Sequence, residues 1–128
     1  MNYKSVFVVL ITFSLLSFGL PKHLQKKVDK EIKSTYNIES FTFNAISIST
    51  EVTQTLSVPF GTDNLFEIKS DANLLGYAYV AKAPSKTDEF DYLVLLDKDL
   101  IVLKVKVLVY REDYGGEIGS KRWLKQFI

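Results

Sequence analysis

Two apolar stretches joined by a short polar connection set the strongest constraint on the fold of this chain. Residues 90–96 are nearly all apolar, and residues 100–110 alternate between apolar and polar side chains over much of their length, which is typical of β-strands. The connection between them, Asp97-Lys98-Asp99, is short enough for a hairpin turn. The pattern predicts two antiparallel strands in the last third of the chain.

Further strands are predicted upstream of this hairpin. A polar turn at 70–73 and a longer loop at 83–89 separate segments that are rich in apolar, aromatic and β-branched residues. A register shift predicts a bulge near Ala45 in the first of them. The predicted strands cover residues 41–49, 50–58, 65–69, 74–82, 90–96 and 100–110.

The last predicted strand indicates how the sheet is exposed. Lys104 and Lys106 alternate with apolar residues, so one face of this strand is predicted to pack and the other to face water. The sheet is therefore predicted to be an antiparallel meander with one wet face. The residues predicted for the packed face are Ile101, Leu103, Val105, Val107 and Val109.

Helices are predicted at both ends of this sheet. In residues 21–36 an apolar residue recurs every fourth position, after a proline that suits a first helical turn. The stripe is narrow and favours a helix on a sheet surface, or a stalk between a membrane and the domain. Ser120 is predicted to cap a second helix, which carries Trp123, Leu124 and Phe127 on one side. The predicted fold class is α+β, an antiparallel meander sheet with an N-terminal and a C-terminal helix.

The first twenty residues indicate the compartment. Residues 5–20 carry no charge, follow Lys4 and precede a lysine cluster, as in a secretory signal peptide. The run is slightly short for a bilayer span, and an uncleaved membrane anchor stays open as the alternative. In either case the domain is expected outside the cytoplasm. We divide the chain into residues 1–20 (signal or anchor), 21–36 (helix or stalk) and 37–128, a domain expected to be incomplete at its C-terminus.

Composition excludes several functions. The 16 basic and 15 acidic residues balance, so no nucleic-acid partner is expected. With no cysteine and one histidine, His23, which is predicted to be exposed, thiolate and histidine-rich metal chemistry are not expected. Acidic residues cluster near predicted turns and are interpreted as solvated, so no hydrolytic site is predicted. These are Asp88, Glu89, Asp91, Asp97, Asp99, Glu112 and Asp113.

Residues 110–119, Y-R-E-D-Y-G-G-E-I-G, are the segment whose composition indicates a function beyond folding. Gly115, Gly116 and Gly119 allow positive φ and a close approach of the backbone to a bound group. A solvated turn after a strand explains the same composition, and composition alone favours that explanation. One or two of the nearby aromatic residues, such as Tyr114 or Trp123, could stack on a flat ligand.

Three segments carry a family resemblance. The run starting Gly76-Tyr-Ala-Tyr-Val-Ala-Lys, the strand-turn-strand L-V-L-L-D-K-D-L-I-V-L-K-V-K-V-L and residues 110–119 followed by W-L-K-Q-F resemble the FMN-binding domain family. The family comprises the extracytoplasmic flavin subunits of the sodium-pumping NADH:quinone oxidoreductase and of the Rnf electron-transport complex, and related secreted flavoproteins. The resemblance covers residues 76–127.

The resemblance implies a cofactor, partners and a site. It implies FMN, electron transfer, and a membrane redox complex or a quinone-linked electron donor as partner. Against the family pattern H-x-E-T-P-G-L-G, Glu112 and Gly115 match and the histidine, threonine and proline positions differ. The residues implied to bind the cofactor are Glu112, Asp113, Tyr114, Gly115 and Gly116.

The family attaches FMN covalently to a threonine in an S-G-A-T-like segment, and no threonine of this chain has that context. In the family this segment follows the W-L-K-Q-F-like helix, so it would begin after Ile128. The alternative hypothesis from the sequence is a secreted, non-enzymatic binding module with a cystatin-like arrangement of a helix on an antiparallel sheet, which would bind a peptide or protein through its hairpin loops.

Overall fold

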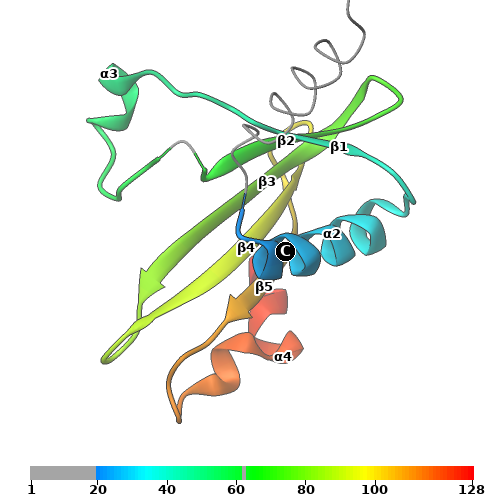
Figure 1. Cartoon of the computed structure of the whole chain (residues 1–128). Coiled ribbons are helices and arrows are strands. Elements are labelled where there is room, and N and C mark those ends of the chain that lie inside the picture. The colour runs from blue at the N-terminus through cyan, green and yellow to red at the C-terminus, as the bar shows by residue number, and fades with distance from the viewer. Residues whose placement is uncertain (1–19, 62) are drawn as a thin grey trace, which may run out of the picture.

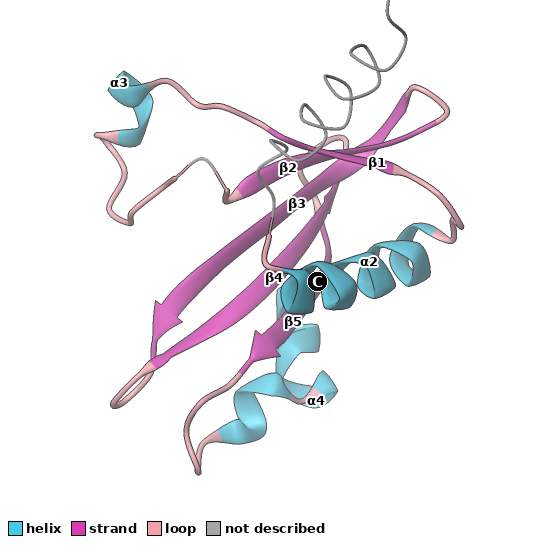
Figure 2. Ribbon diagram, in the orientation of Figure 1, coloured by secondary structure: helices cyan, strands magenta, loops and turns pink. Residues whose placement is uncertain are grey.

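The computed structural model describes residues 20–61 and 63–128, and it confirms the predicted α+β class. A five-stranded antiparallel sheet has the order β1-β2-β3-β4-β5, so each strand pairs with its neighbour in the sequence. Helix α2 lies across one face of this sheet, and the C-terminal helical segment lies beside β5 (Figures 1 and 2). The elements are α2 (Lys22–Tyr36), β1 (Thr42–Ala45), α3 (Thr50–Thr53), β2 (Leu65–Ser70), β3 (Asn73–Pro84), β4 (Glu89–Asp97), β5 (Val102–Val109), η1 (Gly116–Gly119), α4 (Lys121–Leu124) and η2 (Lys125–Phe127).

Helix α2 forms where the four-residue repeat predicts it. It begins directly after Pro21 and ends at Tyr36. The next residue, Asn37, caps the helix in a left-handed conformation (φ 54°), and its N–H donates to the carbonyl of Lys33. The three apolar residues Leu24, Val28 and Ile32 are buried against the sheet. The prediction of a helix on a sheet surface is therefore confirmed.

The face of the sheet under α2 is the hydrophobic core. Every second residue of the central strands points into it, and several of these side chains have no exposed surface. Each fully buried Leu, Ile or Phe side chain contributes about 1.5–3 kcal/mol relative to an exposed one. We call this side the closed face; its buried sheet residues are Phe66, Ile68, Ala78, Val80, Leu93, Leu95 and Leu108.

The prediction that the lysines of β5 face water while its alternate residues form the packed face is wrong. The two lysines of β5 lie on the closed face, where the carboxylate of Glu31 in α2 is 3.5 Å from Nζ of Lys104 and 3.8 Å from Nζ of Lys106. Val102, Val105 and Val107 of β5 point to the opposite side, whereas Val109 packs against the core under α2. The predicted apolar face also breaks up, because β4–β5 pairing skips Leu103 and Leu108 at two register shifts. An alternating sequence pattern does not reveal such bulges. The lysines can lie on the closed face because β5 is an edge strand and the neighbouring helix supplies a carboxylate that pairs with them.

The predicted strand at 50–58 is also wrong. Residues Thr50–Thr53 form the short helix α3, and β1 covers only Thr42–Ala45 of the segment predicted at 41–49. β-Branched side chains favour strands mainly when a partner strand covers them, and Val52 here remains 51% exposed. No neighbouring strand covers these residues, so their preference for strands does not determine the structure here.

The hairpin turn and the C-terminal helix agree with their predictions. The carboxylate of Asp97 accepts hydrogen bonds from the N–H groups of Asp99 (2.8 Å) and Ile101 (2.9 Å), which fixes the β4–β5 turn. Ser120 caps α4 by accepting a hydrogen bond from the N–H of Trp123 at 3.2 Å. The predicted signal or anchor lies outside the described residues except for Leu20. Within residues 20–61 and 63–128, no helix has the length and apolar character needed to cross a membrane.

Candidate binding site

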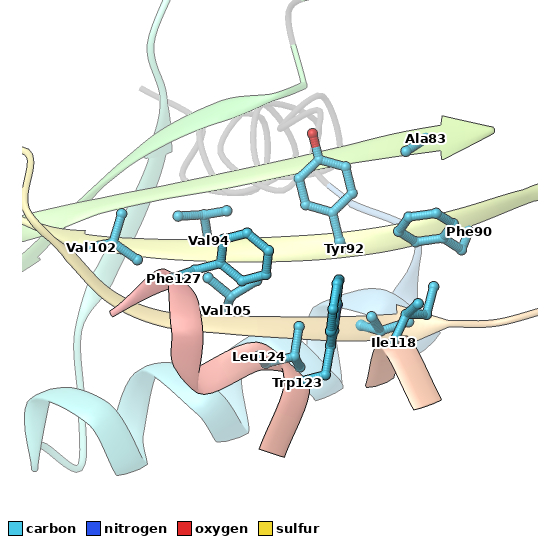
Figure 3. Close-up of a pocket in the computed structure, with 11 residues that line it drawn as sticks. Ala83, Phe90, Tyr92, Val94, Val102, Val105, Ile118, Trp123, Leu124 and Phe127 are labelled. Carbon is cyan, nitrogen blue, oxygen red and sulfur yellow. The ribbon is translucent and has the colours of Figure 1, made fainter. Parts of the chain in front are cut away.

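An apolar cavity of about 540 Å³ lies on the side of the sheet opposite α2, which we call the open face. The C-terminal segment forms its outer wall, and β4 and β5 form its floor (Figure 3). This volume lies within the range of about 300–1,000 Å³ that small-molecule pockets occupy. Its lining residues are Ala83, Phe90, Tyr92, Val94, Val102, Val105, Val107, Ile118, Trp123, Leu124 and Phe127.

The cavity has an aromatic wall that is only partly covered. In Figure 3 the side chains of Trp123 and Leu124 reach from the C-terminal segment toward the strands. Trp123 and Phe127 make an edge-to-face contact with their ring centroids 6.2 Å apart. Both rings remain about half exposed, at 46% and 50%. None of the side chains that line the cavity carries a charge, so the cavity favours an apolar group over a charged one.

A row of aromatic rings continues from the cavity floor across the open face. Tyr92 lies 6.1 Å from Phe90 on one side and 6.1 Å from Tyr79 on the other, between ring centroids. Tyr79 in turn stacks on Phe60 at 5.9 Å. Burial raises the pKa of Tyr92 above the usual tyrosine value, and the neighbouring hydroxyl of Tyr79 adds to the increase. Tyr92 therefore stays neutral at physiological pH.

The segment after β5 is tied to the β3–β4 hairpin through Glu112. Its carboxylate accepts hydrogen bonds from the N–H of Lys86 (2.8 Å), from the N–H of Thr87 (3.0 Å) and from the Thr87 hydroxyl. These bonds lower the pKa of Glu112, and the Thr87 hydroxyl has the largest effect. The carboxylate that the resemblance assigns to the cofactor thus already has three donors from the protein itself.

Arg111 makes a second link between the same elements. Its guanidinium donates to Asp91, with Nη2 3.1 Å from the carboxylate, and to the carbonyl of Glu89 at 3.0 Å. Asp91 is only 2% exposed, so the interpretation of this carboxylate as solvated is wrong. The paired carboxylate raises the pKa of Arg111. A buried acid needs such a partner, but the sequence does not show that Arg111, twenty positions away, provides it.

The glycines after this link form a tight turn with an open side. Gly115 has φ 77°, and a Cβ there would lie 2.8 Å from the hydroxyl oxygen of Tyr110. That hydroxyl donates to the carbonyl of Tyr114 at 2.5 Å, so Gly115 is required by the turn itself. A Cβ at Gly116 would have no neighbour within 4 Å. Within the described part of the chain, the N–H groups of Gly115 and Gly116 donate to no protein group.

None of the five residues that the resemblance implies for cofactor binding lines the cavity. Glu112 faces the hairpin, and Tyr114 is 56% exposed with Nζ of Lys86 5.6 Å from its ring centroid. The turn they form leads directly into η1, whose Ile118 lines the cavity. Asp113, Gly115 and Gly116 are exposed beside them. Their proposed role in binding stays a prediction.

Sequence reasoning missed most of the cavity floor, although one signal was present. Apart from Asp91, residues 90–96 are apolar or aromatic at both alternating positions. Both faces of β4 are therefore largely apolar: Leu93 and Leu95 lie on the closed face, and Tyr92 and Val94 lie on the open face. A strand with apolar side chains on both faces needs other elements packed on both faces of the sheet. The short C-terminal helices cover only part of the open face.

Comparison with known proteins finds no match: no protein-family model, no curated protein and no solved structure is similar to the chain. The resemblance to FMN-binding domains therefore remains a prediction from the quoted motifs. In the described residues, no three His, Cys, Asp or Glu side chains are grouped so that they could hold a metal ion.

Proposed function

We propose that this protein is an extracytoplasmic electron-transfer protein that binds FMN, with the isoalloxazine ring in the cavity between the open face and the C-terminal segment. The observation that carries the proposal is the uncharged, aromatic-lined cavity of about 540 Å³, which the motif-bearing segment 110–127 closes on one side. The same part of the chain thus carries both the sequence resemblance and a cavity suited to a flat aromatic ring.

The cavity fits the ring of FMN, but its phosphate does not belong inside it. An aromatic ring gains dispersion and stacking contacts from Trp123, Phe90 and Tyr92. A phosphate dianion would be desolvated there without a cationic partner, because no lining side chain is charged. The phosphate and ribityl chain are therefore assigned to the exposed turn, where the N–H groups of Gly115 and Gly116 are available.

FMN, when bound, supplies the reversible electron chemistry. The residues of the protein would hold and shield the ring: Trp123 and Phe127 would cover it on the side of the C-terminal segment, and Val102, Val105 and Val107 would exclude water on the side of the sheet. Because no threonine has the attachment context, the proposal for these residues concerns noncovalent binding. A membrane redox complex or a quinone-linked donor is the proposed partner.

The test is a titration of the purified chain with FMN. Trp123 is the one tryptophan of the sequence, so its emission reports directly on an isoalloxazine ring placed in the cavity. We expect FMN to quench this emission. We also expect Trp123→Ala to weaken FMN binding, measured by flavin fluorescence, by at least about fivefold, since stacking on an aromatic ring contributes on the order of 1–3 kcal/mol.

Two control variants separate the cavity from the turn and from the rest of the surface. Tyr114→Ala removes an exposed ring that is outside the cavity, and Leu56→Ala removes an exposed side chain from the segment after α3. We expect unchanged binding for Leu56→Ala and a smaller loss for Tyr114→Ala than for Trp123→Ala. A folded wild-type protein that binds no FMN at millimolar concentration would refute the proposal and favour the secreted cystatin-like binding module.

A further inference from the structure

The outward side of α2 carries a stripe of lysines. Lys22, Lys26, Lys30 and Lys33 follow one another at intervals of four, four and three residues, which places them on one side of the helix. All four are exposed, while Leu24, Val28 and Ile32 on the other side are buried. At about 1.5 Å of rise per residue the stripe is roughly 16 Å long. We call it the lysine stripe.

The two acidic residues of α2 do not neutralise this stripe. Glu31 pairs with Lys104 and Lys106 of β5, at 3.5 and 3.8 Å. Asp29 is half-buried and accepts a hydrogen bond from the amide of Gln25 at 2.6 Å. None of the four lysines of the stripe makes a salt bridge with any described residue. Since the whole chain has a formal net charge of only +1, the stripe reflects a segregation of charge rather than an excess.

We propose that the lysine stripe docks α2 lengthwise on a membrane surface rich in anionic phospholipids. The chain enters α2 directly from the uncharged run 5–20, so the stripe begins two residues after the segment predicted to enter or cross a membrane. Lysine ammonium groups on flexible stems suit the mobile headgroups of such a surface. Each contributes about 1 kcal/mol close to an anionic bilayer.

Features of the stripe favour lipid over nucleic acid. It contains no arginine for bidentate recognition of phosphate and no aromatic ring for base stacking. The apolar side of α2 is fully used by the sheet, so attachment through the stripe is electrostatic and sensitive to salt. The open face lies on the other side of the sheet, and docking therefore leaves the cavity turned away from the membrane (Figure 1).

The experiment compares binding of the full chain to vesicles of phosphatidylglycerol mixed with phosphatidylcholine and to vesicles of phosphatidylcholine alone. The ratio of the two affinities isolates the charge effect, because residues 5–20 are uncharged and contribute in both lipids. We expect at least a tenfold preference for the anionic vesicles at low salt. We expect that preference to vanish near ~0.5 M salt, where the Debye length falls to a few ångströms.

Two variants with the same change in net charge test whether the preference for anionic vesicles comes from the lysine stripe or from the total charge. The first replaces the stripe, Lys22→Gln, Lys26→Gln, Lys30→Gln and Lys33→Gln, and is expected to lose the preference. The second replaces four exposed lysines elsewhere, Lys82→Gln, Lys98→Gln, Lys121→Gln and Lys125→Gln, and is expected to keep it. Equal losses in both variants, no lipid preference in the wild type, or selective binding of the stripe to an oligonucleotide instead of lipid would each overturn the proposal.

Discussion

The two faces of the sheet are built from similar side chains and are packed to different degrees. On the closed face, Val28 and Ile32 of α2 have no exposed surface, and they contact strand residues that are equally buried. On the open face, Val105 and Val107 are only half-buried, and the aromatic rings of Trp123 and Phe127 above them are about half exposed. A continuous helix of 15 residues covers one face, whereas the short elements η1, α4 and η2 partly cover the other.

This difference separates the part that stabilises the fold from the part that can bind. Close packing on the closed face gives each side chain its full set of dispersion contacts. Side chains around the cavity lack those contacts on one side, so an apolar ring placed there gains contacts that the protein alone leaves unmade. We therefore expect substitutions on the closed face to act mainly on stability and substitutions around the cavity to act mainly on binding.

The largest effect is expected when isoleucine is replaced by alanine on each face in turn. Ile32→Ala removes a fully buried side chain from under the closed face, and we expect it to lower the free energy of unfolding by about 2–5 kcal/mol. Ile118→Ala removes a half-buried side chain from the wall of the cavity, with an expected loss of about 1 kcal/mol. Denaturant unfolding followed by far-UV circular dichroism measures both. Equal losses would show that the two faces contribute equally to stability.

The sequence predicts the closed face better than the open one. The spacing of Leu24, Val28 and Ile32 identifies the helix and its buried side, because helical periodicity depends on the local sequence alone. The antiparallel order of the strands follows from short polar connections such as the one at Asp97. The wrong strand at 50–58 shows the limit of the same method, since strand propensity without a partner strand does not decide the structure.

The site depends on contacts that no local pattern contains. Asp91 is buried because Arg111 pairs with it across two strands, and Glu112 is held by the hairpin at Lys86 and Thr87. The side to which Lys104 turns is set by register shifts in β5 and by Glu31 of α2. These pairings join residues far apart in the sequence, so composition gives the residue types but not their neighbours.

A smaller effect is expected where α2 ends against the sheet. A Cβ at Gly76 would lie 2.0 Å from the carbonyl oxygen of Leu96 and 2.8 Å from the hydroxyl of Tyr36. Gly76→Ala must therefore shift β3 from β4 or displace the tyrosine, and we expect a loss of about 1–3 kcal/mol in the free energy of unfolding. Gly116→Ala is the matched control beside the cavity, where nothing lies within 4 Å of the added carbon. Its expected change is within about 0.5 kcal/mol, and a larger loss there would mean that the exposed turn is packed as tightly as the core.

The smallest expected effect concerns the hydroxyl of Tyr36, which donates to the carbonyl of Leu96 at 2.6 Å. Burial raises the pKa of Tyr36 to about 12, and the charge of Asp97 adds to the increase. A tyrosine in the unfolded chain ionises near pH ~10, so the contribution of Tyr36 is complete below that pH and is lost as pH rises toward 12. Tyr36→Phe is expected to lower the free energy of unfolding by about 1 kcal/mol at neutral pH.

The same variant should also flatten the decline in stability between pH 10 and 12, measured by urea unfolding at each pH. A residual slope is expected in the variant, because the pKa values of Tyr92 and Tyr110 on the other side of the sheet are raised as well. A decline as steep as that of the wild type would place the alkaline sensitivity on the open face. The hydrogen bond that joins the end of α2 to β4 would then make no measurable contribution to stability.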